Sequence, residues 1–144
     1  MLEAVGEAYW PTFFKTLRQR LNLRGSAVLQ VITIDQSRFE SYRRRPEFIQ
    51  RYIFPGGMLP TTEIIEQMVA NAGLRLVSSK FFGDSYARTL GEWHRRFQEA
   101  WPSIEALGFD DRFKRMWGYY LAYCRLGFEI GVLNVGLYKI ERQR

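Results

Sequence analysis

The sequence is poor in cysteine and histidine, with one of each, Cys124 and His94. A single cysteine excludes an internal disulfide, and these two side chains are too few soft ligands for a structural zinc site. We therefore expect no bound metal and take a reducing, cytoplasmic setting as the default. No apolar run approaches the roughly 20 residues that span a bilayer. The opening residues, MLEAVGEAYW, lack the basic and apolar regions of a signal peptide.

Nucleic-acid-binding motifs are also missing, although the net charge is +6 and the pI is near 9.7. No helix-turn-helix, zinc-finger or aromatic RNA-binding pattern occurs, so we expect no nucleic-acid partner. The basic residues form short scattered groups, of which Arg43, Arg44 and Arg45 are one. A solvated surface is the simpler interpretation of these groups. The alternative is contact with anionic material such as phospholipid headgroups or an acidic ligand.

What the chain does have is an apolar fraction of 47% over 144 residues, enough for one domain with a core. The hydrophobic periodicity predicts alternating helices and strands, which is an α/β order. In chain order we expect a helix over 10–21, a strand covered on both faces over 26–34, a long functional insertion over 35–60, a helix from Thr61 or Thr62 to Gly73, a strand over 74–82, two helices, and a strand over 132–140. The inward stripes of the two later helices are expected to be Leu90, Trp93, Phe97 and Trp101, and then Phe113, Met116, Trp117, Tyr120, Leu121, Cys124 and Phe128, with Asp110 capping the second.

No glycine-rich turn follows the first expected strand, although such turns bind nucleotide-like cofactors in parallel α/β enzymes. Gly56 and Gly57 follow a proline in a loop that no clear strand precedes, which favours an ordinary turn over a phosphate cradle. Three strands make a small sheet, and the apolar first strand would lie at an edge. We expect another segment to pair with that edge.

Five stretches together resemble the cyclopropane fatty acid synthases over essentially the whole chain: MLEAVGEAYWPTFF, VLQVITI, FIQRYIFPGGMLP, YARTLGEWHRRF and FKRMWGYYLAYCRLGF. The resemblance implies the C-terminal half of a class I, Rossmann-like methyltransferase fold, with residues 1–144 forming one partial domain. The half that binds S-adenosylmethionine would be absent, so no cofactor-binding residue is expected here. The sheet would be a three-stranded remnant with inserted helices. Its last strand would be antiparallel and would lie between the other two.

The family reaction moves a methyl group from a sulfonium to an alkene carbon of an acyl chain, and then removes a proton to close a three-membered ring. A bound bicarbonate ion is the base. By resemblance, the bicarbonate pocket would use Glu3, Tyr86, Cys124 and the backbone amide of Ile32. Glu3 would accept the ion's proton, and the other groups would donate to its oxygens.

Gln30 stands where many relatives have histidine. An amide can make the same two hydrogen bonds but does not titrate, so we keep Gln30 as a binding candidate and not as a proton relay. Without the resemblance, Cys124 would be interpreted as a core thiol, Tyr86 as a cap or packing residue, and Glu3 as a solvated carboxylate. His94 is expected to be structural or exposed.

The substrate channel would be lined, by the same resemblance, by residues from RYIFPGGMLP and from the last helix: Arg51, Tyr52, Phe54, Met58, Trp117 and Tyr120. Arg51 would lie near a phosphate headgroup, and aromatic faces would stabilise a carbocation. A packed Pro-Gly turn is the equal alternative for that motif. The implied partners are unsaturated phospholipid acyl chains, a peripheral membrane surface on the inner face of the membrane, and either a complementary N-terminal polypeptide or a second copy. The chain alone would be inactive.

Two other functions remain open. One is a non-enzymatic association module of a split protein. The other is a relative that methylates another lipid without ring closure.

Overall fold

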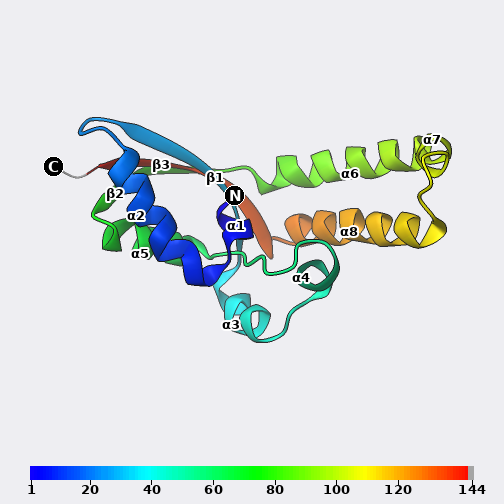
Figure 1. Ribbon diagram of the computed structural model, residues 1–144, viewed down its shortest axis with the longest axis horizontal. Coiled ribbons are helices and arrows are strands. Elements are labelled where there is room, and N and C mark those ends of the chain that lie inside the picture. Colours follow the sequence, from blue (N-terminus) through cyan, green and yellow to red (C-terminus); the bar gives the residue numbers. More distant parts are fainter. Residues whose placement is uncertain (143–144) are drawn as a thin grey trace. The chain divides into compact units, whose positions relative to one another are not determined.

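In the computed structural model, which describes residues 1–142, three strands form one sheet with β3 in its centre (Figure 1). β1 spans Ser26–Ile34, β2 spans Leu74–Phe81 and β3 spans Leu133–Arg142. β3 runs antiparallel to β2, in a register that places Leu74 opposite Arg142 and Phe81 opposite Gly136. The strand order and the antiparallel last strand confirm the topology that the resemblance implies.

The chain divides into two units, which are described separately. The first contains Met1–Phe82 and the last strand from Asn134 onward, and the second contains Gly83–Leu133. The sheet therefore belongs almost wholly to the first unit. The second unit is helical and is inserted between β2 and β3, as the inserted helices of the predicted fold require.

In the first unit, α1 spans Leu2–Val5, the short 3₁₀ helix η1 spans Glu7–Tyr9, α2 spans Trp10–Arg20 and α5 spans Thr62–Asn71. α5 begins where predicted, because the Thr61 hydroxyl accepts a hydrogen bond from the N–H of Ile64 at 3.2 Å. It ends before Gly73, whose φ of 67° is the left-handed conformation that glycine adopts without strain. α5 packs on β2, and α2 packs on α5. The largest fully buried side chains of this core are Trp10, Tyr138, Phe14, Ile65, Leu74 and Ile140.

The prediction that β1 is covered on both faces is wrong for the described chain. Burial is confined to the end of the strand, at Val31, Thr33 and Ile34, while Val28 is 60% exposed. The strand does lie at an edge of the sheet, as expected. An apolar run records a tendency towards burial, but it does not specify which neighbours supply the cover.

The insertion expected over 35–60, for which the sequence predicts no regular element, contains two helices. α3 spans Gln36–Arg44 and α4 spans Phe48–Tyr52. Each begins at a local cap: the Asp35 carboxylate accepts from the N–H of Ser37 at 2.9 Å, and the N–H of Glu47 donates to the Gln50 side chain at 2.9 Å. These short-range hydrogen bonds stabilise helices whose apolar stripe is too short to show periodicity.

The second unit consists of α6 over Gly83–Glu99, α7 over Trp101–Glu105 and α8 over Asp111–Glu129, with α6 packed along α8. Asp110 caps α8 as predicted, accepting from the N–H of Phe113 at 2.8 Å. The expected inward stripe of α6 is partly wrong, since Trp93 is 46% exposed whereas Leu90 and Phe97 are buried. Trp93 lies at the margin of that stripe, where its ring packs edge-on against Tyr86 at 6.2 Å.

Candidate functional site

Glu3 is held on α1 by packing and by main-chain hydrogen bonds. Leu2 beside it is buried, and its carbonyl accepts from the indole N–H of Trp10 at 3.2 Å. The carbonyl of Glu3 accepts from the N–H of Met58 at 2.8 Å. The Glu3 carboxylate accepts from the N–H of Ile32 at 2.7 Å, and its side chain is only 20% exposed. Glu3 is therefore a fixed acceptor, and its interpretation as a solvated carboxylate is wrong.

The contact between Glu3 and Ile32 follows from the position of β1 at the edge of the sheet. Alternate N–H groups of a strand point to the same side, so those of Ile32 and Ile34 share one direction. The N–H of Ile34 donates to the carbonyl of Pro60 at 3.0 Å. A side chain and a loop carbonyl thus complete the edge with which no strand within residues 1–142 pairs. Gln30 lies on the same face of β1 as Ile32, and it is exposed.

In the second unit, Tyr120 lies close enough to Cys124 and to Tyr86 for each of them to affect its pKa. Tyr120 and Cys124 are one helical turn apart on α8, and the Tyr86 ring on α6 packs against Phe128 at 5.1 Å. Burial raises the pKa of the Cys124 thiol to about 12. Burial, followed by the nearby Cys124 and Tyr86, raises the pKa of Tyr120 to about 12. Both groups are protonated at neutral pH, so the Cys124 thiol carries the proton that its predicted donor role requires.

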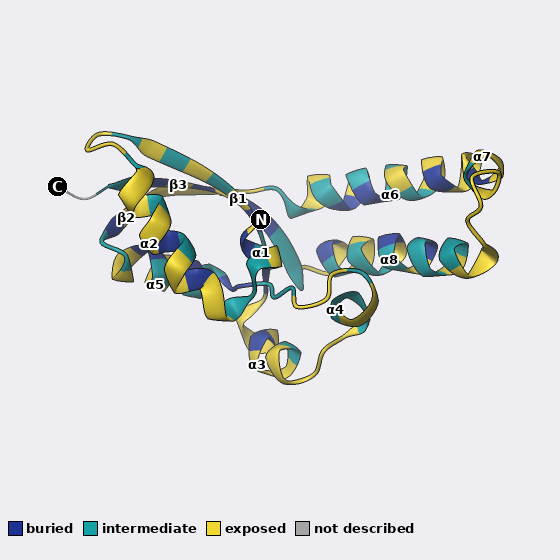
Figure 2. Ribbon diagram, in the orientation of Figure 1, coloured by how far each residue is buried: buried dark blue, intermediate teal, exposed yellow. Residues whose placement is uncertain are grey.

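Among the residues of the predicted channel, Trp117 and Tyr120 lie together on α8, with ring centroids 5.0 Å apart. The RYIFPGGMLP motif forms the end of α4 and a turn closed by the Gln50 amide, which donates to the carbonyl of Gly57 at 3.2 Å. The turn is packed at Met58, which is half-buried. By contrast Arg51, Tyr52 and Phe54 are exposed, the last two at 59% and 53%. Figure 2 shows how exposed, half-buried and buried residues are distributed along α3 and α4.

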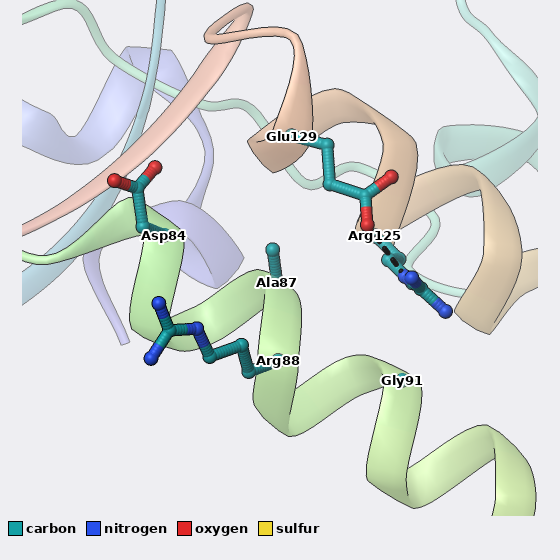
Figure 3. A pocket seen from close by; sticks show the side chains of 6 residues that line it. All are labelled: Asp84, Ala87, Arg88, Gly91, Arg125 and Glu129. Atoms are coloured by element: carbon teal, nitrogen blue, oxygen red, sulfur yellow. Dashed lines mark hydrogen bonds and ion pairs between the residues drawn. The ribbon is translucent and has the colours of Figure 1, made fainter.

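A pocket of about 450 Å³ opens on the second unit between α6 and α8 (Figure 3). Its lining residues are Asp84, Ala87, Arg88, Gly91, Arg125 and Glu129. The Arg125 guanidinium lies over Gly91, where a Cβ would come within 3.2 Å of Nη1, and it pairs with Glu129 at 2.7 Å. The sequence did not mark these residues, because charged side chains one turn apart on a helix are typical of a solvated surface. No residue assigned to the bicarbonate or the channel lines this pocket.

Three further expectations concern a metal site, a cofactor-binding turn and the environment of His94. Within residues 1–142, no cluster of histidine, cysteine or acidic side chains is arranged to hold a metal ion, and no helix is long and apolar enough to cross a membrane. β1 passes through Asp35 directly into α3, so the described residues offer no glycine-rich turn after that strand. His94 is half-buried on α6 and forms a hydrogen bond with Gln98 at 3.2 Å.

Comparison with known proteins places the whole chain beside one family. The sequence model of mycolic acid cyclopropane synthetases matches residues 1–138. The chain is 40% identical over 144 residues to the tuberculostearic acid methyltransferase UfaA1 of Mycobacterium tuberculosis, covering 99% of this chain and 34% of that protein. It is 33% identical over 130 residues to the cyclopropane-fatty-acyl-phospholipid synthase of Escherichia coli, covering 89% of this chain and 32% of that protein.

Solved structures show the same fold. The mycolic acid cyclopropane synthase CmaA1, complexed with SAH and CTAB, superposes with a TM-score of 0.88 at 23% identity, covering 98% of this chain and 52% of that one. The cyclopropane synthase MmaA2 of Mycobacterium tuberculosis superposes with a TM-score of 0.87 at 26% identity, covering 96% and 52%. The chain spans about a third of the length of the curated relatives.

Proposed function

Because the chain belongs to the mycolic acid cyclopropane synthetase family of S-adenosylmethionine-dependent methyltransferases, we propose that it supplies the substrate and base half of a lipid methyltransferase. The observation that carries the proposal is the family match over residues 1–138. The acceptor would be the double bond of an acyl chain in an unsaturated phospholipid. Activity would require a complementary polypeptide equivalent to the remaining part of the relatives.

S-adenosylmethionine, when bound, supplies the methyl group. The residues of this chain would position the bicarbonate base that accepts the proton lost afterwards. Glu3 fits the acceptor role, since its carboxylate is fixed and mostly buried. Tyr86 and Cys124 fit the donor roles towards bicarbonate, because a phenol and a neutral thiol each offer a proton to an oxyanion. The rings of Trp117 and Tyr120 would line the acyl channel, where their faces would stabilise positive charge.

The test is complementation. The chain is mixed with a separately produced N-terminal polypeptide, S-adenosylmethionine and unsaturated phospholipid dispersed in detergent, and the fatty acids are analysed by mass spectrometry. We expect neither cofactor binding nor product from the chain alone, and both after complementation. Tight cofactor binding by the isolated chain would contradict the proposal that the N-terminal polypeptide supplies the cofactor site. Cofactor binding without any lipid product after complementation would favour the association module.

A substitution identifies the donor role of Tyr86. Tyr86→Phe should lower turnover by about a hundred-fold, the typical effect of removing one positioned hydrogen-bond donor. Tyr119→Phe is the matched control, because Tyr119 lies 53% exposed on α8. Equal activity of the two variants would remove Tyr86 from the proposed site.

A second candidate is methyl transfer without ring closure. It is favoured by the name of the relative that is 40% identical, a tuberculostearic acid methyltransferase. The same product analysis separates the two functions, because a branched methyl or methylene product excludes cyclopropane formation.

A further inference from the structure

The net positive charge of the protein is confined to one unit. The first unit carries 14 lysines and arginines against 8 acidic residues, whereas the second carries 7 of each. The whole net charge of +6 therefore belongs to the unit that contains the sheet. The excess of basic residues favours contact of the first unit with an anionic partner.

Half of that charge lies in residues 36–54, which contain α3, α4 and the turn after α4. Five arginines stand there against two glutamates. The Arg43 guanidinium already has a partner within the fold, because it forms an ion pair with Glu7 with N–O distances of 2.8 and 2.9 Å. Arg44 forms an ion pair with Glu40 at 3.4 Å. Arg45 and Arg51 are exposed and form no ion pair within residues 1–142. These two guanidinium groups are available to an external anion.

Exposed aromatic side chains accompany the two arginines. Tyr52 follows Arg51 directly at the end of α4, and Phe54 lies two residues further on, and each has more than half of its surface exposed. Arginine beside tyrosine and phenylalanine is the combination found where proteins meet a lipid–water interface: the cations contact phosphates and the rings enter the headgroup layer. An acidic protein would use the arginines but would not require the exposed rings.

The segment is also held in place beneath this surface. The Arg43–Glu7 pair joins α3 to η1, and the N–H of Leu59 donates to the Tyr42 hydroxyl at 3.3 Å. The Gln50 side chain closes the turn after α4. These hydrogen bonds hold the base of the segment while its arginines and rings remain exposed, so docking would require little ordering.

We propose that residues 36–54 dock the protein onto an anionic phospholipid bilayer, with Arg45 and Arg51 on the phosphates. Tyr52 and Phe54 would enter the headgroup layer, in place of the channel role that the resemblance implies for these two exposed rings. The inference rests on the proposed function, because it names the surface that would bring a lipid methyltransferase to its substrate. It needs no cofactor and no turnover, so it is tested separately.

The test is co-sedimentation of the chain with phosphatidylcholine vesicles and with vesicles that also contain phosphatidylglycerol. We expect binding only to the anionic vesicles, and weaker binding as salt is raised. Arg45→Gln combined with Arg51→Gln should weaken binding about twenty-five-fold, since each basic residue at an anionic surface contributes roughly a five-fold effect. Tyr52→Ser combined with Phe54→Ser should weaken it further, with less dependence on salt. Circular dichroism verifies that each variant is folded.

The matched control is Arg112→Gln combined with Arg115→Gln, which removes two exposed arginines from the neutral unit and should leave binding within two-fold. Equal loss in both arginine pairs would overturn the proposal, because it would show a response to net charge alone. Loss of vesicle binding on adding the N-terminal polypeptide would also overturn it, by identifying the segment as an interface between the two halves. The two proposals fail separately, because vesicle binding is measured on the chain alone and lipid product on the unsubstituted complemented enzyme. Product from that enzyme without anionic-vesicle binding by the unsubstituted chain would overturn the docking proposal alone.

Discussion

The main-chain N–H of Ile32 donates to the carboxylate of Glu3 at 2.7 Å, joining the first helix to the edge strand of the sheet. The resemblance assigns both groups to the bicarbonate pocket, and in this structure they bind each other. An edge-strand N–H that is partly withdrawn from water costs free energy when it has no acceptor. Glu3 therefore stabilises the fold in addition to any role in proton transfer.

Substitution of Glu3 should separate these roles. Glu3→Ala leaves the N–H of Ile32 without its acceptor and should lower the free energy of unfolding by about 1–3 kcal/mol. Glu3→Gln keeps an oxygen acceptor and should cost less, while still removing the charge that a proton acceptor needs. Urea unfolding followed by circular dichroism measures both variants. Glu105→Ala, on an exposed part of α7, is the control and should stay within about 0.5 kcal/mol of the parent chain. A Glu3→Ala variant as stable as the control would contradict this role.

The sequence predicts the main elements of the fold because their signals are local. Thr61, Gly73 and Asp110 mark helix ends by hydrogen bonds or backbone conformation within a few residues, and the structure confirms all three. The two helices within 35–60 and the exposure of β1 were missed. The two helices are too short for their apolar residues to show a helical period. The burial of β1 depends on segments that are far away in sequence.

The candidate site is predictable only through the resemblance. Nothing near Glu3 in sequence indicates that its carboxylate reaches Ile32, because the two are 29 residues apart. Cys124 likewise lies on the apolar stripe of α8, and its half-buried thiol is what a packing residue would show. The assignment of these residues to one bicarbonate ion stays a prediction, as does the role of Gln30.

The raised pKa of Cys124 predicts how stability depends on pH. Burial raises the pKa of this thiol from 9.0 to about 12, so the folded chain holds the proton more tightly than the unfolded chain does. The corresponding stability is present below pH 9 and is lost as the pH rises towards 12. Cys124→Ser removes this titration, so its free energy of unfolding should fall less steeply over that range. Parallel curves for the two chains would contradict the burial of the thiol.

We expect glycine to be required at position 127 because of the neighbouring Leu133 side chain, and not because of its own backbone conformation. A Cβ built there would lie 2.7 Å from Cδ1 of Leu133, closer than real Cβ contacts, and 3.0 Å from its Cγ, which is tighter than most, so the Leu133 side chain must shift. Gly127→Ala should therefore destabilise the chain by about 1–3 kcal/mol, although alanine favours a helix. In a Leu133→Ala background the clash is removed, and the same substitution should be neutral or stabilising by up to about 1 kcal/mol. Equal effects in the two backgrounds, measured by urea unfolding, would exclude overpacking as the cause.

Gln30→His should add a titrating group to the proposed site. Glutamine does not ionise, so the complemented enzyme should show no change in rate that originates from this position. Histidine has an ordinary pKa of about 6.5, and its imidazolium form cannot accept a proton. If Gln30 touches the bicarbonate ion, the variant should lose activity as the pH falls below about 6.5 and should match the parent above it. Gln36→His places the same group at the exposed start of α3 and should leave the profile unchanged. If the pH profile of Gln30→His superposes on that of the control, position 30 does not contact the bicarbonate ion. A histidine that touched the ion would gain a positive charge on protonation, and this charge would change the rate.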